Sequence, residues 1–152
     1  MLVMKFGGTS VGDAQCFRRV KEIVARSGRE HAPVVVVVSA MSTVTETLLD
    51  AARRAVAGDS KGVAEKLEYL EQKHLQTAEE LFTGTQREAA RKAVLAIVEE
   101  FRRICGGMEM LRELPLRAMD AGLSVGERLS ATLLATYLQD QGIPAQMVDG
   151  AQ

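Results

Sequence analysis

The sequence predicts an α/β fold: part of a three-layer α/β/α arrangement around a mostly parallel sheet, with a helical excursion from it. Segments 2–6 and 33–40 carry apolar residues on both faces, as parallel strands covered by helices do. Between them lies a segment with apolar residues at helical spacing, which predicts a strand–helix–strand unit. A third apolar segment, 145–148, predicts another short strand after a final helix. A chain of 152 residues fits one domain.

Two strands and two helices are predicted in the first 57 residues. The valines within 33–40 favour extended structure, because branching at Cβ restricts their rotamers in a helix. The segment 2–6 shares the apolar character but is less valine-rich. Apolar residues at helical spacing predict one helix over about 16–28 and another over about 44–57.

Segment 59–120 is rich in charged side chains and contains no convincing strand. Its apolar stripes predict two long amphipathic helices, broken near 82–86 and ended at the glycines of 105–107. We expect this helical excursion to be either a solvated layer or an interaction surface. A further helix over 124–142, ended by its last glycine, precedes the third strand.

Composition excludes several classes of function. With 19 basic and 20 acidic side chains, the chain has no basic field that indicates nucleic acid or an anionic membrane surface. The most apolar stretch, 33–41, is far too short to cross a bilayer, and no signal peptide is recognisable. Cys16 and Cys105 lack disulfide or metal-ligand spacing, which fits a cytoplasmic protein without a metal site. His31 and His74 are expected as ordinary histidines at the surface or its boundary.

The stretch "KFGGTS" (5–10) places a lysine at the end of an apolar strand, before two glycines and two hydroxyls. Paired glycines let backbone N–H groups approach a ligand, and the lysine adds a positive charge, so the stretch describes an anion cradle. It has neither the spacing of a Walker A loop nor that of a dinucleotide-binding loop. The alternative is a plain glycine turn, with Ser10 or Asp13 capping the next helix and the lysine in solvent. The cradle residues are Lys5, Gly7, Gly8, Thr9 and Ser10.

Two other loops are candidates for ligand contacts. The loop 39–46 follows a strand and brings hydroxyls to the carboxyl end of the sheet, where open α/β folds bind ligands. Thr43 and Glu46 also fit a helix capping box, and so do Ser124 and Glu127 before the last helix. From spacing alone, capping is the stronger interpretation of both patterns.

Three blocks carry a resemblance that spans essentially the whole chain: "MKFGGTSVGD", "VVVVVSAMSTVTETLL" and "SVGERLSATLLATYLQDQGIPAQMVDG". In this order and spacing they resemble the amino-terminal half of aspartokinases, in the amino acid kinase family. The resemblance implies that residues 1–152 form the amino acid-binding lobe of such a kinase domain. The resemblance implies that Lys5 contacts the transferring phosphoryl group and that the loop after the first strand contacts phosphate through Gly7, Gly8, Thr9 and Ser10. It also implies that Ser39 and Thr45 contact the amino acid and that Glu127 binds its ammonium group.

The resemblance also implies an activity and partners. Aspartokinases phosphorylate the side-chain carboxylate of L-aspartate from MgATP, towards lysine, threonine and methionine. This sequence has no counterpart of the carboxy-terminal nucleotide-binding half or of the regulatory domains, so we expect the lobe alone to be inactive. A homodimer is one expected assembly. Thr43, where many aspartokinases have glycine, and Glu46, where they have Asn or Asp, depart from the family pattern. Two alternatives stay open: a short binding or assembly module without catalysis, and a kinase of another amino acid completed by a separate subunit.

Overall fold

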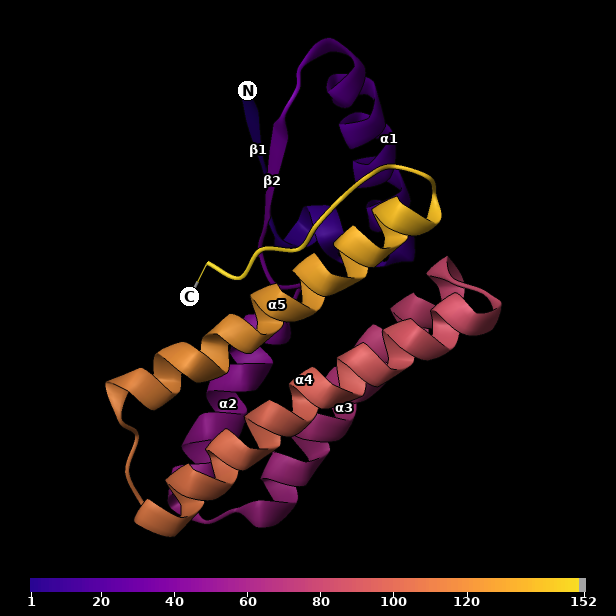
Figure 1. Ribbon diagram of the computed structural model, residues 1–152. Helices are drawn as coiled ribbons and strands as arrows, with labels where there is room; N and C mark the ends of the chain where they lie inside the picture. The colour runs from indigo at the N-terminus through magenta and orange to yellow at the C-terminus, as the bar shows by residue number, and fades with distance from the viewer. Residues whose placement is uncertain (151–152) are drawn as a thin grey trace.

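A two-stranded sheet and five α-helices make up the computed structural model, which describes residues 1–150 (Figure 1). The helices α2 to α5 lie side by side along most of their length, while α1 and the strands lie at one end. The elements are β1 (Leu2–Phe6), the short 3-10 helix η1 (Gly8–Val11), α1 (Ala14–Glu30), β2 (Val34–Val38), α2 (Val44–Ala57), α3 (Ser60–Leu81), α4 (Gly84–Leu111) and α5 (Leu116–Asp140).

The two strands are parallel, as predicted. Their register pairs Leu2 with Val34 and Phe6 with Val38, so both strands end at the same edge of the sheet. Helix α1 connects them, and α1 and α5 both contact β2. The α/β class and the strand–helix–strand unit are therefore confirmed.

One face of this sheet lies against the core and the other is open. Successive strand residues point to opposite faces, so each strand alternates between half-buried and exposed side chains. On the open face, Val3 is 59% exposed, Val35 44% and Val37 45%. Of the predicted three layers, the described residues thus supply the sheet and the helices on one side of it.

The predicted third strand at 145–148 is wrong. After α5 the chain runs back past the strands without regular structure (Figure 1). A strand requires a neighbouring backbone, and β1 and β2 pair only with each other. The backbone here finds a side-chain partner instead, since Gln139 Nε2 donates to the carbonyl of Ala145 at 2.6 Å.

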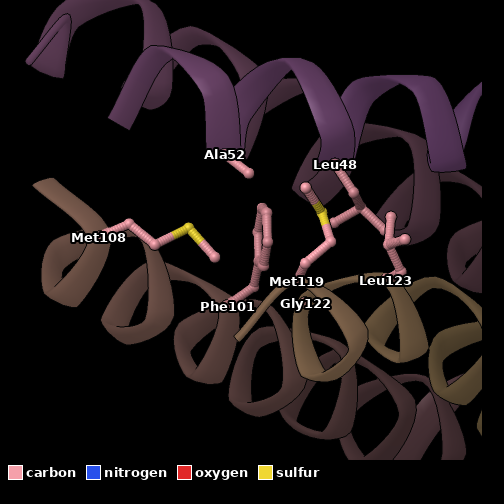
Figure 2. Close-up of a pocket in the computed structure, with 7 residues that line it drawn as sticks. All are labelled: Leu48, Ala52, Phe101, Met108, Met119, Gly122 and Leu123. Atoms are coloured by element: carbon pink, nitrogen blue, oxygen red, sulfur yellow. The ribbon is translucent and has the colours of Figure 1, made fainter. Parts of the chain in front are cut away.

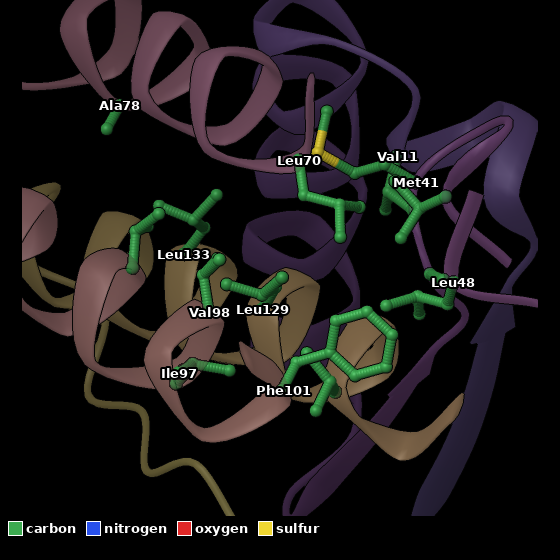
Figure 3. Close-up of a cluster of buried hydrophobic side chains, with 14 of the residues drawn as sticks. Val11, Met41, Leu48, Leu70, Ala78, Ile97, Val98, Phe101, Leu129 and Leu133 are labelled. Carbon is green, nitrogen blue, oxygen red and sulfur yellow. The ribbon is translucent and has the colours of Figure 1, made fainter. Parts of the chain in front are cut away.

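The helical excursion packs into the core. Helices α3 and α4 contact each other and also α2, and α5 closes the group, which we call the α2–α5 bundle. Its centre is a cluster of buried apolar side chains (Figure 3). Buried side chains in it include Leu48, Leu70, Val98, Phe101, Leu129 and Leu133. No helix among residues 1–150 is both long and apolar enough to cross a membrane.

Several predicted helix boundaries are wrong, and buried contacts explain why. Helix α4 continues past the glycines of 105–107 to Leu111, because Cys105 and Met108 are both buried and hold its last turns on the core. Glycine inside a helix costs only about 1 kcal/mol relative to alanine, which such packing offsets. Similarly, α1 runs through Gly28 to Glu30.

His74 is fully buried, although the sequence predicts it to lie at the surface or its boundary. It is 0% exposed on α3, and its Nδ1 lies 2.6 Å from the carbonyl of Leu70. Burial lowers the pKa of His74 to about 4, so the ring is neutral near pH 7. Continuing the apolar stripe of Val63, Leu67 and Leu70 by four residues predicts this position, so helical spacing held the missed signal.

Candidate functional site at the carboxyl edge of the sheet

Hydrogen bonds join the segments that follow β1 and β2. The backbone N–H of Ser39 donates to the carbonyl of Phe6 at 3.0 Å, and Ser42 Oγ donates to the carbonyl of Gly8 at 3.0 Å. A Cβ at position 8 would lie 2.8 Å from the carbonyl oxygen of Ala40, so only glycine fits this close approach without a shift. The predicted phosphate-side loop and the loop 39–46 therefore form one surface.

Lys5 lies near the end of β1, beside this surface. Its side chain is exposed, and no ion pair holds it among residues 1–150. It points to the open face of the sheet, on the same side as Val3. The lysine is thus available to a negatively charged ligand at the place where the strands end.

The glycine-rich loop after β1 forms a tight turn. Residues Gly8–Val11 form the turn η1, in which the N–H of Ser10 donates to the carbonyl of Gly7 at 2.9 Å. Helix α1 begins only after Asp13, whose carboxylate accepts from the N–H of Cys16 at 2.8 Å and has its pKa lowered chiefly by that bond. The start of α1 is therefore already capped, as one alternative predicted, and the exposed turn carries Thr9.

The capping box predicted at Thr43 and Glu46 is wrong. Thr43 does sit at the start of α2, but its side chain makes no capping bond to the helix. Its φ of 70° lies in the left-handed region, which costs a β-branched residue about 1–2 kcal/mol. Thr45, in the first turn of α2, is exposed beside it, and Ser39 is half-buried. These two predicted amino acid contacts thus lie on either side of a strained turn.

Helix α5 brings Glu127 to the same region. A Cβ at Gly126 would lie 2.8 Å from the Cβ of Ala40, so α5 is seated directly on the loop after β2. Glu127, the next residue, is exposed. The predicted capping box is again wrong, because α5 begins at Leu116 and Ser124 Oγ donates to the carbonyl of Ala121 within the helix.

Elsewhere the structure holds an apolar hollow between α2, α4 and α5 that is too narrow for a water molecule (Figure 2). Its lining carries no charged side chain: Leu48, Ala52, Phe101, Met108, Met119, Gly122 and Leu123. It is a packing gap in the core rather than a binding site. Within residues 1–150, no three His, Cys, Asp or Glu side chains gather as metal ligands would.

Comparison with known proteins identifies the fold and its lineage. The model of the amino acid kinase family matches residues 1–152. This chain belongs to that family. The structure of Escherichia coli aspartokinase III in complex with aspartate and ADP superposes with a TM-score of 0.81 and 26% identity over 96% of this chain. The amino acid kinase fold is therefore confirmed.

The curated proteins that are similar to this chain include aspartokinases. Aspartokinase 1, chloroplastic, of Arabidopsis thaliana is 34% identical over 97% of this chain, and the aspartokinase of Chlamydia trachomatis is 35% identical over 99%. The chain spans only 25% and 31% of the length of these relatives, and 30% of the solved chain of aspartokinase III. The resemblance predicted from the three sequence blocks is confirmed.

Proposed function

We propose that this chain forms the amino acid-binding lobe of an aspartokinase, which phosphorylates the side-chain carboxylate of L-aspartate from MgATP. The observation that carries the proposal is the convergence at one sheet edge of Lys5, the turn after Gly7, the loop 39–45 and Glu127. It is supported by the aspartate and ADP bound in the similar aspartokinase III.

The proposed reaction needs positive charge more than a base. A carboxylate oxygen of aspartate attacks the γ-phosphorus, the bond from that phosphorus to the bridging oxygen breaks, and ADP leaves. The carboxylate is ionised at neutral pH, so no group has to remove a proton. Repulsion between the carboxylate and the phosphates is the obstacle, and the exposed ammonium of Lys5 would reduce it.

The remaining contacts follow from charge and position. Glu127 would pair with the ammonium group of aspartate, while Ser39 and Thr45 would contact it from the loop after β2. The backbone of Gly7 and Gly8 and the hydroxyls of Thr9 and Ser10 would face the phosphates. Magnesium would arrive with the nucleotide, since residues 1–150 offer no acidic cluster to hold it alone.

The decisive experiment has two stages. First, L-aspartate is titrated into the 152-residue chain while amide signals are followed by NMR; shifts centred on Ser39, Thr45 and Glu127 are expected. Second, the remaining length of an aspartokinase is supplied in trans, and ATP-dependent acyl phosphate is trapped with hydroxylamine. Absence of both signals would overturn the proposed function.

Lys5→Ala tests the role of the lysine, with Lys61→Ala as the matched control. Lys61 is also an exposed lysine, but it lies on α3. Removing a group that stabilises transition-state charge costs about 100- to 1,000-fold in turnover. Lys5→Ala should therefore lose about that much acyl phosphate formation with aspartate binding retained, while Lys61→Ala keeps it. Unchanged turnover in Lys5→Ala would remove the lysine from the mechanism.

The assembly and location of the chain are part of the same proposal. We propose that the open valine face of the sheet is covered in the assembled protein, by the rest of the kinase or by a second copy in a homodimer. A short assembly module would use the same face without turnover. Light scattering on the 152-residue chain and on Val35→Lys separates a dimer through this face from a monomer. We propose a cytoplasmic location, and the similar proteins include aspartokinases named chloroplastic.

A further inference from the structure

Thr43 lies at the centre of a chain of hydrogen bonds that links α3 to the phosphate-side loop. Its Oγ1 lies 2.5 Å from the carbonyl of Ser42 and 2.6 Å from the hydroxyl of Tyr69, which is on α3. Ser42 in turn donates from Oγ to the carbonyl of Gly8. Thr43 therefore joins Tyr69 to Ser42, and Ser42 is itself bonded directly to Gly8.

The direction of these bonds follows from the number of protons. A carbonyl only accepts, so Thr43 Oγ1 must donate its single proton to Ser42. The hydroxyl of Tyr69 is then the donor to Thr43 Oγ1. A phenylalanine at position 69 would keep the ring and lose this donor alone.

We propose that Tyr69 is a positioning residue, which holds Thr43 in the left-handed conformation and so fixes the loop 39–45 against the loop after β1. The proposal deepens the proposed function, because that loop is where the amino acid substrate would bind. A threonine does not adopt a φ of 70° freely, and the bond from Tyr69 is made in this conformation, which it therefore stabilises. Glycine would adopt the same φ without help.

The backbone on the far side of Thr43 depends on the same conformation. The carbonyl of Thr43 accepts from the N–H of Thr47 at 3.1 Å and from Thr47 Oγ1 at 2.8 Å, and the N–H of Val44 donates to Met41 at 3.0 Å. These amides begin α2, and their protection from hydrogen exchange reports directly on the shape of the turn.

A double-mutant cycle tests the proposal on the 152-residue chain: Tyr69→Phe, Thr43→Gly and the two together. In the threonine background, Tyr69→Phe should speed exchange of the Val44 and Thr47 amides about fivefold, the usual effect of one lost hydrogen bond. With glycine at 43 there is no hydroxyl to hold, so Tyr69→Phe should have no further effect. If the tyrosine acts only through packing, Tyr69→Phe should change amide exchange equally in the threonine and glycine backgrounds, and that result would overturn the proposal. Unchanged exchange in Tyr69→Phe would overturn it as well.

Two controls and one binding measurement complete the design. Tyr137→Phe makes the same chemical change on α5, beside Phe82, and should leave the loop amides unchanged. The amide of His31, bonded to Ser27 at the end of α1, should exchange equally in every variant. L-aspartate should bind Tyr69→Phe several-fold more weakly than the parent chain. If the parent chain shows neither aspartate binding nor acyl phosphate formation with the remaining length supplied in trans, the proposed function fails, whereas the exchange cycle still decides the role of Tyr69.

Discussion

The carboxyl edge of the sheet and the α2–α5 bundle are built on opposite principles. At the sheet edge, most candidate side chains are exposed, two loops are joined by single hydrogen bonds, and one turn is strained. In the bundle, long helices bury a continuous apolar interior. The contrast separates the two tasks of the chain: the bundle supplies the stability that lets the edge keep polar groups free for a ligand.

This division makes the two regions differ in their response to substitution. Changes in the bundle should lower the free energy of unfolding, and changes at the edge should alter ligand binding while leaving stability nearly constant.

Phe101→Ala should have the largest effect on stability. The ring is 1% exposed between α2 and α5, next to the apolar hollow (Figure 2), and lies in the central cluster (Figure 3). Removing it should lower the free energy of unfolding by about 3–5 kcal/mol, measured by urea denaturation. Met110→Ala on the same helix is the control, since Met110 is 84% exposed and should change little. A loss below about 1 kcal/mol for Phe101→Ala would mean that the bundle is not the main core.

Acid should weaken the bundle through His74. The neutral ring is favoured in the fold, where its pKa is about 4, while the unfolded chain takes up a proton near pH 6.5. The free energy of unfolding should therefore be unaffected above pH 6.5 and fall as the pH drops from 6.5 to 4, by about 3 kcal/mol at most. Denaturation curves across this range measure the loss.

His74→Gln removes the titrating group and serves as the test of that assignment. The decline between pH 6.5 and 4 should disappear in this variant, although its stability at pH 7 will be lower. His31→Gln, at an exposed position after α1, should keep the full decline. A decline that persists in His74→Gln would assign the acid sensitivity to another group.

Gly126 joins the two regions, and Gly126→Ala should disturb both. An added Cβ would meet Ala40, Val44 and Leu48 at 2.8–3.1 Å, so α5 must move away from the loop after β2. The gain in helix propensity, about 1 kcal/mol, offsets part of an overpacking cost of about 1–3 kcal/mol. We expect a net loss of about 1 kcal/mol, together with weaker aspartate binding.

Gly106→Ala is the matched control for that substitution. It is also a helical glycine, but a Cβ there meets nothing within 4 Å and the position is exposed. It should raise the free energy of unfolding by about 1 kcal/mol, because alanine restricts the unfolded chain and favours the helix. If Gly126→Ala raises the free energy of unfolding by a similar amount, then α5 does not pack closely against the loop after β2.

The same contrast explains what could be predicted from the sequence. Periodicity of 2 and of 3.6 located both paired strands and α2, since these patterns record which faces are buried. It failed where burial overrides a local signal: Gly28 and the glycines at 106 and 107 do not end their helices. The third strand failed for a different reason, because pairing depends on a neighbour that no local pattern reveals.

The site was predictable in its residues but not in its geometry. The three sequence blocks that resemble aspartokinases predicted Lys5 and Glu127 as site residues. The structure brings the elements that carry them to one edge of the sheet. Their contacts stay a prediction. Spacing favoured a cap at Thr43, yet the residue is left-handed and bonded to Tyr69, a contact between separate helices that sequence spacing cannot encode. Gly126 was missed, although a glycine on a buried helix face often indicates a close approach.

The smallest effect on stability is expected at the residue with the largest proposed effect on turnover. Lys5→Ala should change the free energy of unfolding by less than about 0.5 kcal/mol, because the side chain is exposed and unpaired among residues 1–150. Arg128→Ala is the comparison: that guanidinium lies 2.5 Å from Glu100 and 3.3 Å from Asp149, and its loss should cost about 1 kcal/mol. Urea denaturation of both variants decides the matter. If Lys5→Ala lowers the free energy of unfolding as much as Arg128→Ala does, the lysine stabilises the fold. The carboxyl edge of the sheet would then not differ from the bundle in its response to substitution.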